Sequence, residues 1–213
     1  GVRLDVAALF GCALPTGAGI VMNELKPRPR SKVAVFGVGG IGLSAVLALK
    51  LCRCSLIAAV DRDPDKLELA RRLGATHAIE SGRTDALARL LKLTEGKGLD
   101  YSVDATGTAS GIEEAFSAVR KFGGLCIFAS HPPAGERIRL DPYDLICGRQ
   151  IRGSWGGATQ PDDDIPCLLQ RCRNAGVKLH RMITHRYALE DVNKALACLA
   201  HGKAGRILLD TAF

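Results

Sequence analysis

The sequence predicts a doubly wound parallel α/β fold, in which helices cover both faces of one sheet. Short apolar runs alternate along the chain with amphipathic stretches, and this alternation is typical of a parallel α/β sheet. Most of the runs are rich in β-branched residues and almost unbroken in apolar character, as strands buried on both faces must be. A glycine-rich turn directly after the first of these runs strengthens the prediction.

Strands and helices are expected in strict alternation. The predicted strands are Val33–Phe36, Leu56–Val60, His77–Ile79, Tyr101–Val103, Gly124–Ala129 and Ile151–Ser154. The predicted helices are Gly40–Leu51, Asp65–Leu73, Thr84–Leu93, Gly111–Val119 and Tyr143–Cys147. Glycine closely follows several of these helices, and glycine commonly ends a helix because it adopts the left-handed conformation at low cost.

Further segments flank the predicted sheet. Before it we expect a helical lead-in broken near Pro15, over Val6–Leu25, and a basic connector stiffened by proline, over Lys26–Lys32. After it we expect two helices, Pro161–Ala175 and Leu189–His201, and a last strand, Arg206–Leu209. The chain is therefore divided into a lead-in (residues 1–25), the α/β domain (26–160) and a C-terminal segment (161–213).

Composition limits the class of protein. The 213 residues are 47% hydrophobic and 24% charged, which is ordinary for a globular domain, and no apolar run approaches the roughly 18 residues of a membrane span. The formal net charge is +7, but 5% aromatic content disfavours a surface that stacks nucleic-acid bases. Glycine, at 24 residues, is more frequent than usual. We predict neither a nucleic-acid nor a membrane partner.

The cysteines and the first residue bear on location. The eight cysteines include no C-x-x-C pair and lie in apolar or helical contexts, so we expect reduced, buried thiols in a cytoplasmic protein. The sequence starts at Gly1 and its first methionine is Met22, so no targeting peptide can be recognised and the chain is interpreted as cut from a longer protein.

A phosphate-binding loop is predicted where the first strand ends. Val33–Phe36 leads into G-V-G-G-I-G, with glycines at Gly37, Gly39, Gly40 and Gly42, and then into a helix-forming stretch. In this motif the first glycine allows a tight turn, the second lets the backbone approach a pyrophosphate, and the third lets the helix pack closely on the strand. Amides at the helix start then bind the phosphates.

An acidic residue at the end of the second strand completes the prediction of a dinucleotide site. Asp61 lies 19 residues after Gly42, where a carboxylate can accept hydrogen bonds from both ribose hydroxyls of NAD. The same carboxylate would repel a 2′-phosphate, which favours NAD over NADP. Arg62 leaves this choice open, because its guanidinium could flank the adenine or meet a phosphate. Lys66, one helical turn later, is a candidate ribose contact.

Five stretches of sequence resemble the zinc-dependent medium-chain alcohol dehydrogenases. They are GCALPTGAG at residues 11–19 ahead of AVFGVGGIGLSAV, then AAVDRDPDKLELARRLGATHAI, then VDATG, and finally GKAGRILL. The resemblance covers essentially the whole chain. It implies the coenzyme-binding Rossmann domain and the C-terminal segment of such an enzyme, with the N-terminal catalytic domain absent.

The resemblance implies roles for individual residues. Cys12 matches a ligand of the catalytic zinc. Residues that match coenzyme contacts are Thr16, Gly37, Gly39, Gly40, Ile41, Gly42, Asp61, Lys66, Thr106, Ala129, Ser154 and Arg206. Thr16 would lie against the nicotinamide, Ala129 and Ser154 would hold its carboxamide, and Arg206 would reach the pyrophosphate. His131 is a candidate for lining the substrate pocket.

Other parts of the family pattern are missing from these 213 residues. The family's other zinc ligands and its proton relay precede this segment, and no cluster of cysteines matches its structural zinc site. A single thiolate cannot complete a tetrahedral zinc site. We therefore expect no catalytic residue in this chain, no stoichiometric metal and no activity of the chain alone.

The function implied by the resemblance is NAD-dependent oxidation of an alcohol to an aldehyde or ketone, with zinc as Lewis acid in the intact enzyme. Two alternatives stay open: a zinc-independent NADPH enoyl or quinone reductase of the same superfamily, and a non-catalytic NAD-sensing module. Family members commonly pair sheet edges across a two-fold axis, so we expect a homo-oligomer formed through Ile151–Ser154.

Overall fold

The computed structural model describes residues 2–202 and 204–211, and these form a six-stranded, wholly parallel sheet with the order β3-β2-β1-β4-β5-β6. Its strands are β1 (Lys32–Phe36), β2 (Leu56–Asp61), β3 (His77–Glu80), β4 (Tyr101–Asp104), β5 (Leu125–Phe128) and β6 (Gln150–Gly153). The chain starts in the middle of the sheet, builds the β2–β3 half, and returns past β1 to build the other half. The strand order thus reverses between β1 and β4, and the predicted doubly wound fold is confirmed.

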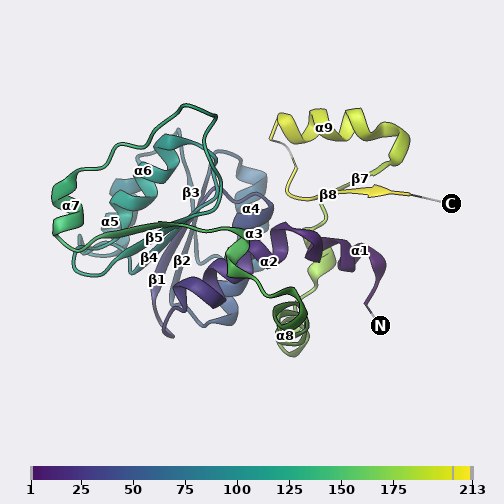
Figure 1. The fold of residues 1–213 in the computed structure, drawn as a ribbon, viewed down its shortest axis with the longest axis horizontal. Coiled ribbons are helices and arrows are strands. Elements are labelled where there is room, and N and C mark those ends of the chain that lie inside the picture. Colours follow the sequence, from purple (N-terminus) through teal and green to yellow (C-terminus); the bar gives the residue numbers. More distant parts are fainter. Residues whose placement is uncertain (1, 203, 212–213) are drawn as a thin grey trace.

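The sheet is buried on both faces, which explains its unbroken apolar strands. Along β1, Val33 and Val35 belong to one hydrophobic cluster, whereas Ala34 and Phe36 belong to another. Successive side chains of a strand point to opposite faces, so the two clusters lie on opposite faces of the sheet. Helices cover both of these faces (Figure 1). These helices are α3 (Gly40–Leu51), α4 (Pro64–Leu73), α5 (Ala86–Leu93) and α6 (Ala109–Ala118), with the short α7 (Pro142–Ile146) before β6.

Polar side chains fix where several of the helices begin. Asp63 accepts hydrogen bonds from the first backbone amides of α4, Asp85 from an amide of α5, and Thr108 from the amide of Gly111 in α6. Such caps satisfy amides that have no partner inside the helix. Gly74 then ends α4 with a φ of 127°, a value that L side chains rarely adopt. Helix starts and stops therefore follow from local sequence.

The lead-in is helical, but its break differs from the prediction. It consists of α1 (Leu4–Ala7), the 3₁₀ helix η1 (Ala8–Gly11), α2 (Ala13–Gly19) and the π-helix η2 (Ile20–Leu25). The chain turns at Cys12, with φ −160° and ψ −78°, and not near Pro15. Pro15 lies in the first turn of α2, where a missing N–H removes no hydrogen bond of the helix. The predicted break near Pro15 is therefore wrong.

Membrane-spanning length is not reached by any single helix among the described residues. Residues Leu4–Gly11 and Ala13–Leu25 are together apolar and long enough, but they meet at a bend of 57°. In this structure Leu14, Ile20 and Val21 of that pair are buried in the hydrophobic core.

The C-terminal segment contains one strand that the sequence analysis did not predict. After β6 and the short η3 (Gly156–Ala158), this segment comprises α8 (Pro161–Asn174), η4 (Leu179–Met182), β7 (His185–Ala188), η5 (Leu189–Asp191), α9 (Val192–Ala200) and β8 (Ile207–Asp210). Strands β7 and β8 pair in parallel as a separate two-stranded sheet. The missed strand β7 alternates half-buried His185 and Tyr187 with exposed neighbours, so it has no apolar run to predict it.

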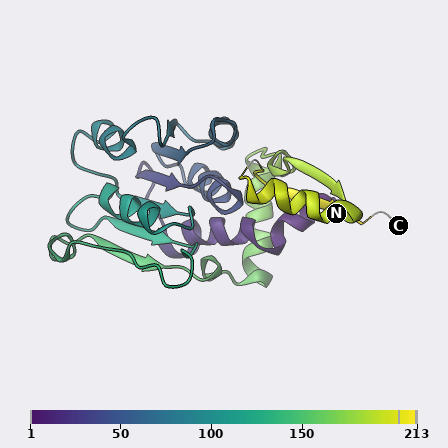
Figure 2. The ribbon, with the colours of Figure 1, turned by 90° about the horizontal axis from the view of Figure 1, so that it is seen from above.

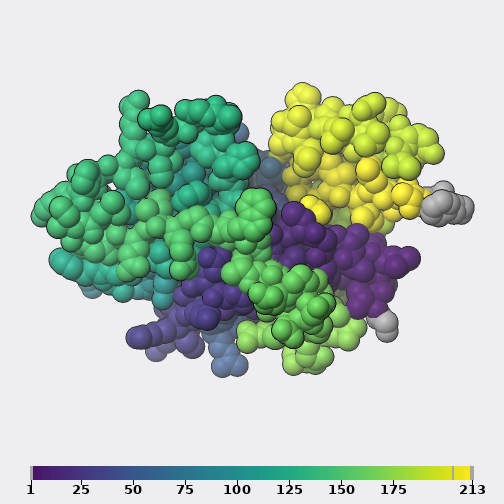
Figure 3. Space-filling model, viewed as in Figure 1, coloured from purple at the N-terminus to yellow at the C-terminus, as the bar shows by residue number. Residues whose placement is uncertain are grey.

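The two ends of the described chain lie together. Figures 1 and 2 both place β7, β8 and α9 beside α1, at the opposite end of the molecule from α7. Arg186 of β7 forms an ion pair with Asp5 of α1 at 2.6 Å and faces Asp210 of β8 at 3.4 Å. On the face shown in Figure 3, the surface is hollowed between this yellow segment and the teal part of the molecule.

The cysteines differ from the prediction in their burial. All eight are free thiols, but only Cys126 and Cys172 are buried, whereas Cys12 and Cys167 are exposed. Cys167 lies on the solvent-facing side of α8 and Cys12 lies at the bend before α2. The expected burial of all eight is therefore wrong.

Candidate dinucleotide-binding site

The glycine-rich loop joins β1 to α3, and its glycines meet different constraints. Gly37 has a φ of 76°, and a Cβ there would lie 2.7 Å from the carbonyl oxygen of Ala105. A Cβ on Gly42 would lie 1.9 Å from the carbonyl oxygen of Gly37, so only glycine allows α3 to pack so closely on the loop. A Cβ on Gly39 would meet no atom within 4 Å. The loop is therefore tight at both ends and open in its middle.

The start of α3 faces that open side. Gly39 is the N-cap residue and no side chain caps the helix, so amides of the first turn lack an intrahelical partner and lie at the positive end of the helix dipole. Arg206 approaches from the C-terminal segment, since its Cδ would be 4.0 Å from a Cβ on Gly40. Amides, dipole and guanidinium together fit an anionic phosphate group.

Asp61 ends β2 beside this loop. Its Oδ2 accepts a hydrogen bond from the backbone amide of Val38 at 2.7 Å, and its Oδ1 accepts one from the amide of Asp63 at 3.0 Å. The carboxylate is half-buried and keeps further acceptor positions, because two ionised oxygens offer about four lone-pair sites. Its orientation is thus fixed by backbone groups, one of them inside the phosphate loop.

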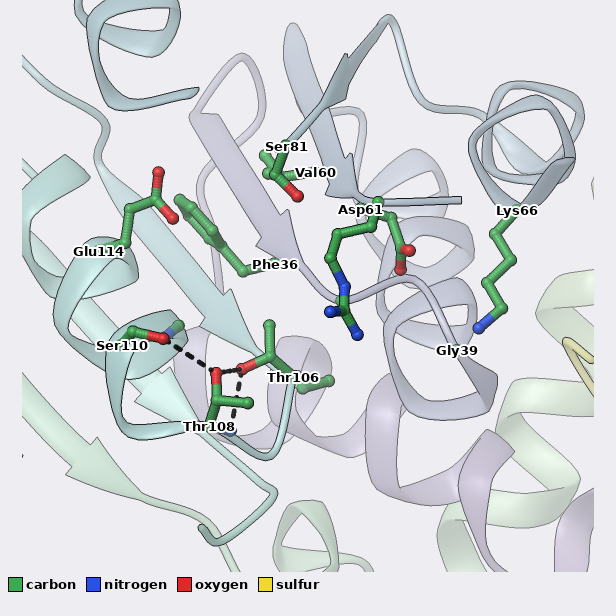
Figure 4. Close-up of a pocket in the computed structure, with 14 residues that line it drawn as sticks. Phe36, Gly39, Val60, Asp61, Lys66, Ser81, Thr106, Thr108, Ser110 and Glu114 are labelled. Carbon is green, nitrogen blue, oxygen red and sulfur yellow. Dashed lines mark hydrogen bonds between the residues drawn. The ribbon is translucent and has the colours of Figure 1, made fainter. Parts of the chain in front are cut away.

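A pocket of about 350 Å³ lies at the carboxyl ends of these strands, where ligands bind in open α/β sheets. Predicted residues that line it are Gly37, Gly39, Asp61, Arg62, Lys66 and Thr106. Figure 4 shows Asp61 and Lys66 on one side of the pocket, across from Ser110 and Glu114 on α6. The sequence analysis did not single out Ser81, Thr108, Ser110 or Glu114, which have no motif of their own.

Asp104 supports the floor of the pocket and was also missed. It ends β4, is fully buried, and its Oδ1 accepts hydrogen bonds from the Thr106 hydroxyl at 2.8 Å and the Thr106 amide at 3.3 Å. Its Oδ2 has no hydrogen-bond partner among the described residues. Burial raises the pKa of Asp104 to about 6, although its bonds to Thr106 oppose that rise. The sequence signal that could have revealed Asp104 is an acidic residue at the end of a largely apolar strand.

The remaining predicted contacts lie outside this pocket. Thr16 is on α2, and its carbonyl oxygen would be 2.3 Å from a Cβ on Gly157. Ser154 directly follows β6; its hydroxyl donates to Glu24 and accepts from the amide of Gly157 at 3.1 Å. Ala129 directly follows β5 and donates its amide to the carbonyl of Asp104 at 3.0 Å. Ser154 and Ala129 were expected inside strands and instead lie one residue beyond them.

Two further predicted residues flank the loop or lie at the surface. Ile41 belongs to the first turn of α3, where its carbonyl oxygen would be 2.1 Å from a Cβ on Gly17 of α2. Gly17 therefore allows α2 to cross close to the start of α3. His131 is exposed, and its ring Nδ1 lies 2.9 Å from the carbonyl oxygen of Pro132.

Cys12 alone does not fit a zinc ion. Its thiol is exposed at the bend before α2. Within residues 2–202 and 204–211, no group of three or more His, Cys, Asp or Glu side chains is arranged to hold a metal. Tetrahedral zinc takes at least three protein donors, so the described residues do not by themselves supply a complete donor set.

Known proteins match both the sequence and the fold. Alcohol dehydrogenase-like 2 of Arabidopsis thaliana is 31% identical over 210 residues, covering 98% of this chain and 54% of that protein. Alcohol dehydrogenase class-2 isozyme 2 of Oryctolagus cuniculus is 34% identical over 209 residues, covering 97% and 55%. The chain thus spans about half the length of these relatives.

Solved structures agree with these matches. The crystal structure of benzyl alcohol dehydrogenase from Acinetobacter calcoaceticus superposes with a TM-score of 0.93 at 31% identity, covering 99% of this chain and 58% of that one. An alcohol dehydrogenase zinc-binding domain protein from Burkholderia ambifaria gives 0.88 at 34% identity, covering 95% and 54%. The family model described as zinc-binding dehydrogenase matches residues 40–174. This match runs from the glycine loop to the end of α8, and the solved structures share the fold. This chain belongs to the zinc-binding dehydrogenase family.

Proposed function

We propose that this chain binds NAD(H) as the coenzyme-binding part of a zinc-dependent alcohol dehydrogenase. The observation that carries the proposal is Asp61, whose carboxylate is hydrogen-bonded to the Val38 amide of the phosphate loop and lines the same pocket as Gly39. A carboxylate there would accept hydrogen bonds from the ribose hydroxyls and repel a 2′-phosphate. This supports NAD over NADP.

The chain's own residues would divide the coenzyme between them. Amides at the start of α3 would hold the pyrophosphate, with Arg206 adding positive charge, while Asp61 and Lys66 would hold the ribose. Thr106 and the planar guanidinium of Arg62 would flank the adenine. For the nicotinamide end we propose Thr16, Ile41, Ala129 and Ser154. Bound NAD would supply a ring that accepts a hydride from the carbinol carbon of the substrate.

We propose an alcohol, or the corresponding aldehyde or ketone, as the substrate, because the matched relatives are named as alcohol dehydrogenases. Cys12 would give one thiolate to a catalytic zinc. The other donors would come from residues outside this sequence, since the chain spans about half the length of its relatives and its described residues form no group of three or more metal donors.

We also propose that copies of this chain associate through the sheet edge at β6. This strand has one free side in the described sheet, and the preceding α7 exposes Tyr143, Leu145 and Ile146. An open edge beside apolar surface favours pairing. Light scattering should give a dimeric or larger mass that falls in Ile146→Asp; a monomeric wild-type chain would contradict this.

The eight free thiols support a reducing compartment such as the cytoplasm.

Titration with NADH tests the proposed coenzyme site. We expect binding in the micromolar to millimolar range for the 213-residue chain, and a loss of at least about tenfold in Asp61→Ala, because a hydrogen bond to a charged group contributes about 1.5–3 kcal/mol. NADPH should bind more weakly than NADH to the wild-type chain. The control is Asp65→Ala, since Asp65 is exposed on α4 and does not line the pocket. Unchanged binding in Asp61→Ala would refute the ribose assignment.

A further inference from the structure

The pocket has two ends with different chemistry. Gly39 and the start of α3 form the phosphate end, and Asp61 lies next to it as the proposed ribose contact. The phosphate, ribose and base of a nucleotide follow one another in that order, so the base must lie toward the remaining walls. The carboxylate on those walls belongs to Glu114.

Glu114 lies on the side of α6 that faces the pocket. It is half-buried, and Figure 4 shows its side chain next to the ring of Phe36, one helical turn beyond Ser110. Burial raises the pKa of Glu114, and the nearby Asp85 carboxylate raises it further, whereas the backbone amide of Leu87 favours the charged form. A group that donates a hydrogen bond from the pocket would stabilise this carboxylate.

Adenine offers such a donor. Its exocyclic amino group carries two N–H donors, whereas an ionised carboxylate only accepts. We propose that Glu114 determines the base specificity of this site, its carboxylate accepting a hydrogen bond from the 6-amino group of adenine. Hypoxanthine carries a carbonyl oxygen at that position, so an acceptor would face the carboxylate and the hydrogen bond proposed for the 6-amino group would be lost. This inference rests on the proposed binding of NAD(H).

A purely structural role of Glu114 makes a different prediction. The Leu87 amide belongs to the first turn of α5, and a carboxylate near a helix N-terminus stabilises the helix. If that were its whole role, substitution would lower the melting temperature and leave the preference between two bases unchanged. The ratio of affinities for two dinucleotides that differ only in the base therefore separates the two roles.

The experiment compares NADH with reduced nicotinamide hypoxanthine dinucleotide, titrated into the 213-residue chain. We expect the wild-type chain to prefer NADH by about tenfold or more, the loss produced when one charge-assisted hydrogen bond is missing. In Glu114→Gln the amide can accept from an amino group or donate to a carbonyl, so the preference should fall to within about twofold. Glu114→Ala should abolish the preference by weakening the binding of NADH.

Glu113→Gln is the matched control. Glu113 is the preceding residue of α6, accepts a hydrogen bond from the Arg139 amide at 2.7 Å, and does not line the pocket. It should retain the wild-type preference. Equal affinity of the wild-type chain for both dinucleotides, or an unchanged ratio in Glu114→Gln, would overturn the role of Glu114 while leaving NAD binding intact. Absence of NADH binding to the wild-type chain would overturn the proposed function and, with it, this inference.

Discussion

The pocket at the ends of β1, β2 and β4 and the bend at Cys12 are both marked by sequence motifs, but they differ in completeness. Around the pocket, Gly37, Asp61 and Asp104 come from three neighbouring strands, and backbone groups fix both carboxylates. At the bend, one exposed thiol belongs to no group of three or more metal donors among the described residues. A phosphate and ribose site can be completed by one folded sheet, whereas a zinc site needs donors that converge from several segments.

Substitution of the loop glycines should give the largest effect. In Gly42→Ala the new Cβ would lie 1.9 Å from the Gly37 carbonyl oxygen, so α3 and β1 cannot keep their packing. We expect a loss of about 3 kcal/mol or more in the free energy of unfolding, measured by denaturant titration, together with loss of NADH binding.

Gly39→Ala is the partner of that experiment. Its Cβ would point into open space, and the φ of −75° at Gly39 suits an L residue. The free energy of unfolding should therefore change by less than about 1 kcal/mol. NADH affinity should still fall by about tenfold, because the methyl group would occupy the space proposed for the pyrophosphate. Wild-type affinity in Gly39→Ala would show that the coenzyme does not approach the loop here.

The sequence predicted features that depend on adjacent residues, and it did not predict those that depend on contacts between distant segments. The apolar strands and the glycine loop were predictable because burial on both faces and backbone sterics act on a few adjacent residues, as in β1 and at Gly42. Strand β7 was missed because it pairs only with the distant β8 and shows no apolar run. The bend was predicted near Pro15 because proline breaks the interior of a helix, although it is tolerated in the first turn. The sequence alone does not show that Pro15 lies in the first turn of α2.

The walls of the pocket show the same limit. Glu114 reaches the site because α6 packs across β4, and nothing in its neighbours along the chain predicts this contact. Arg206 approaches Gly40 only after the chain has passed through β7 and α9. Candidate residues that are close in sequence to a motif were therefore predictable, whereas those brought in by tertiary packing were predicted only where the family resemblance supplied them.

Asp104 should give the next largest effect, as a pH dependence of stability. Its pKa is raised from 3.8 to about 6 by burial, so the folded chain binds the proton more tightly than the unfolded chain. The resulting stabilisation is complete below about pH 4 and is lost as the pH rises through about 6. At one pKa unit per 1.36 kcal/mol, ionisation costs the fold up to about 3 kcal/mol at neutral pH.

Asp104→Asn isolates that cost. The amide oxygen can still accept from Thr106 but carries no charge. Relative to the wild-type chain, the free energy of unfolding of the variant should increase between pH 4 and pH 7.5 by up to about 3 kcal/mol. Denaturant titrations of both proteins at several pH values measure the difference. A difference between the two proteins that does not change with pH would mean that the pKa of Asp104 is unshifted.

Cys12→Ser should give the smallest effect and is the sharpest test of the contrast. Because the thiol is exposed and belongs to no group of three or more metal donors among the described residues, the substitution should change the free energy of unfolding by less than about 0.5 kcal/mol. NADH affinity should stay within about twofold of the wild-type value.

Elemental analysis after dialysis against zinc should find less than one equivalent in either protein. One full equivalent in the wild-type chain, lost in Cys12→Ser, would mean that the chain assembles a complete donor set after all. The bend would then be as complete a site as the pocket, and the proposed need for donors from outside the sequence would fail.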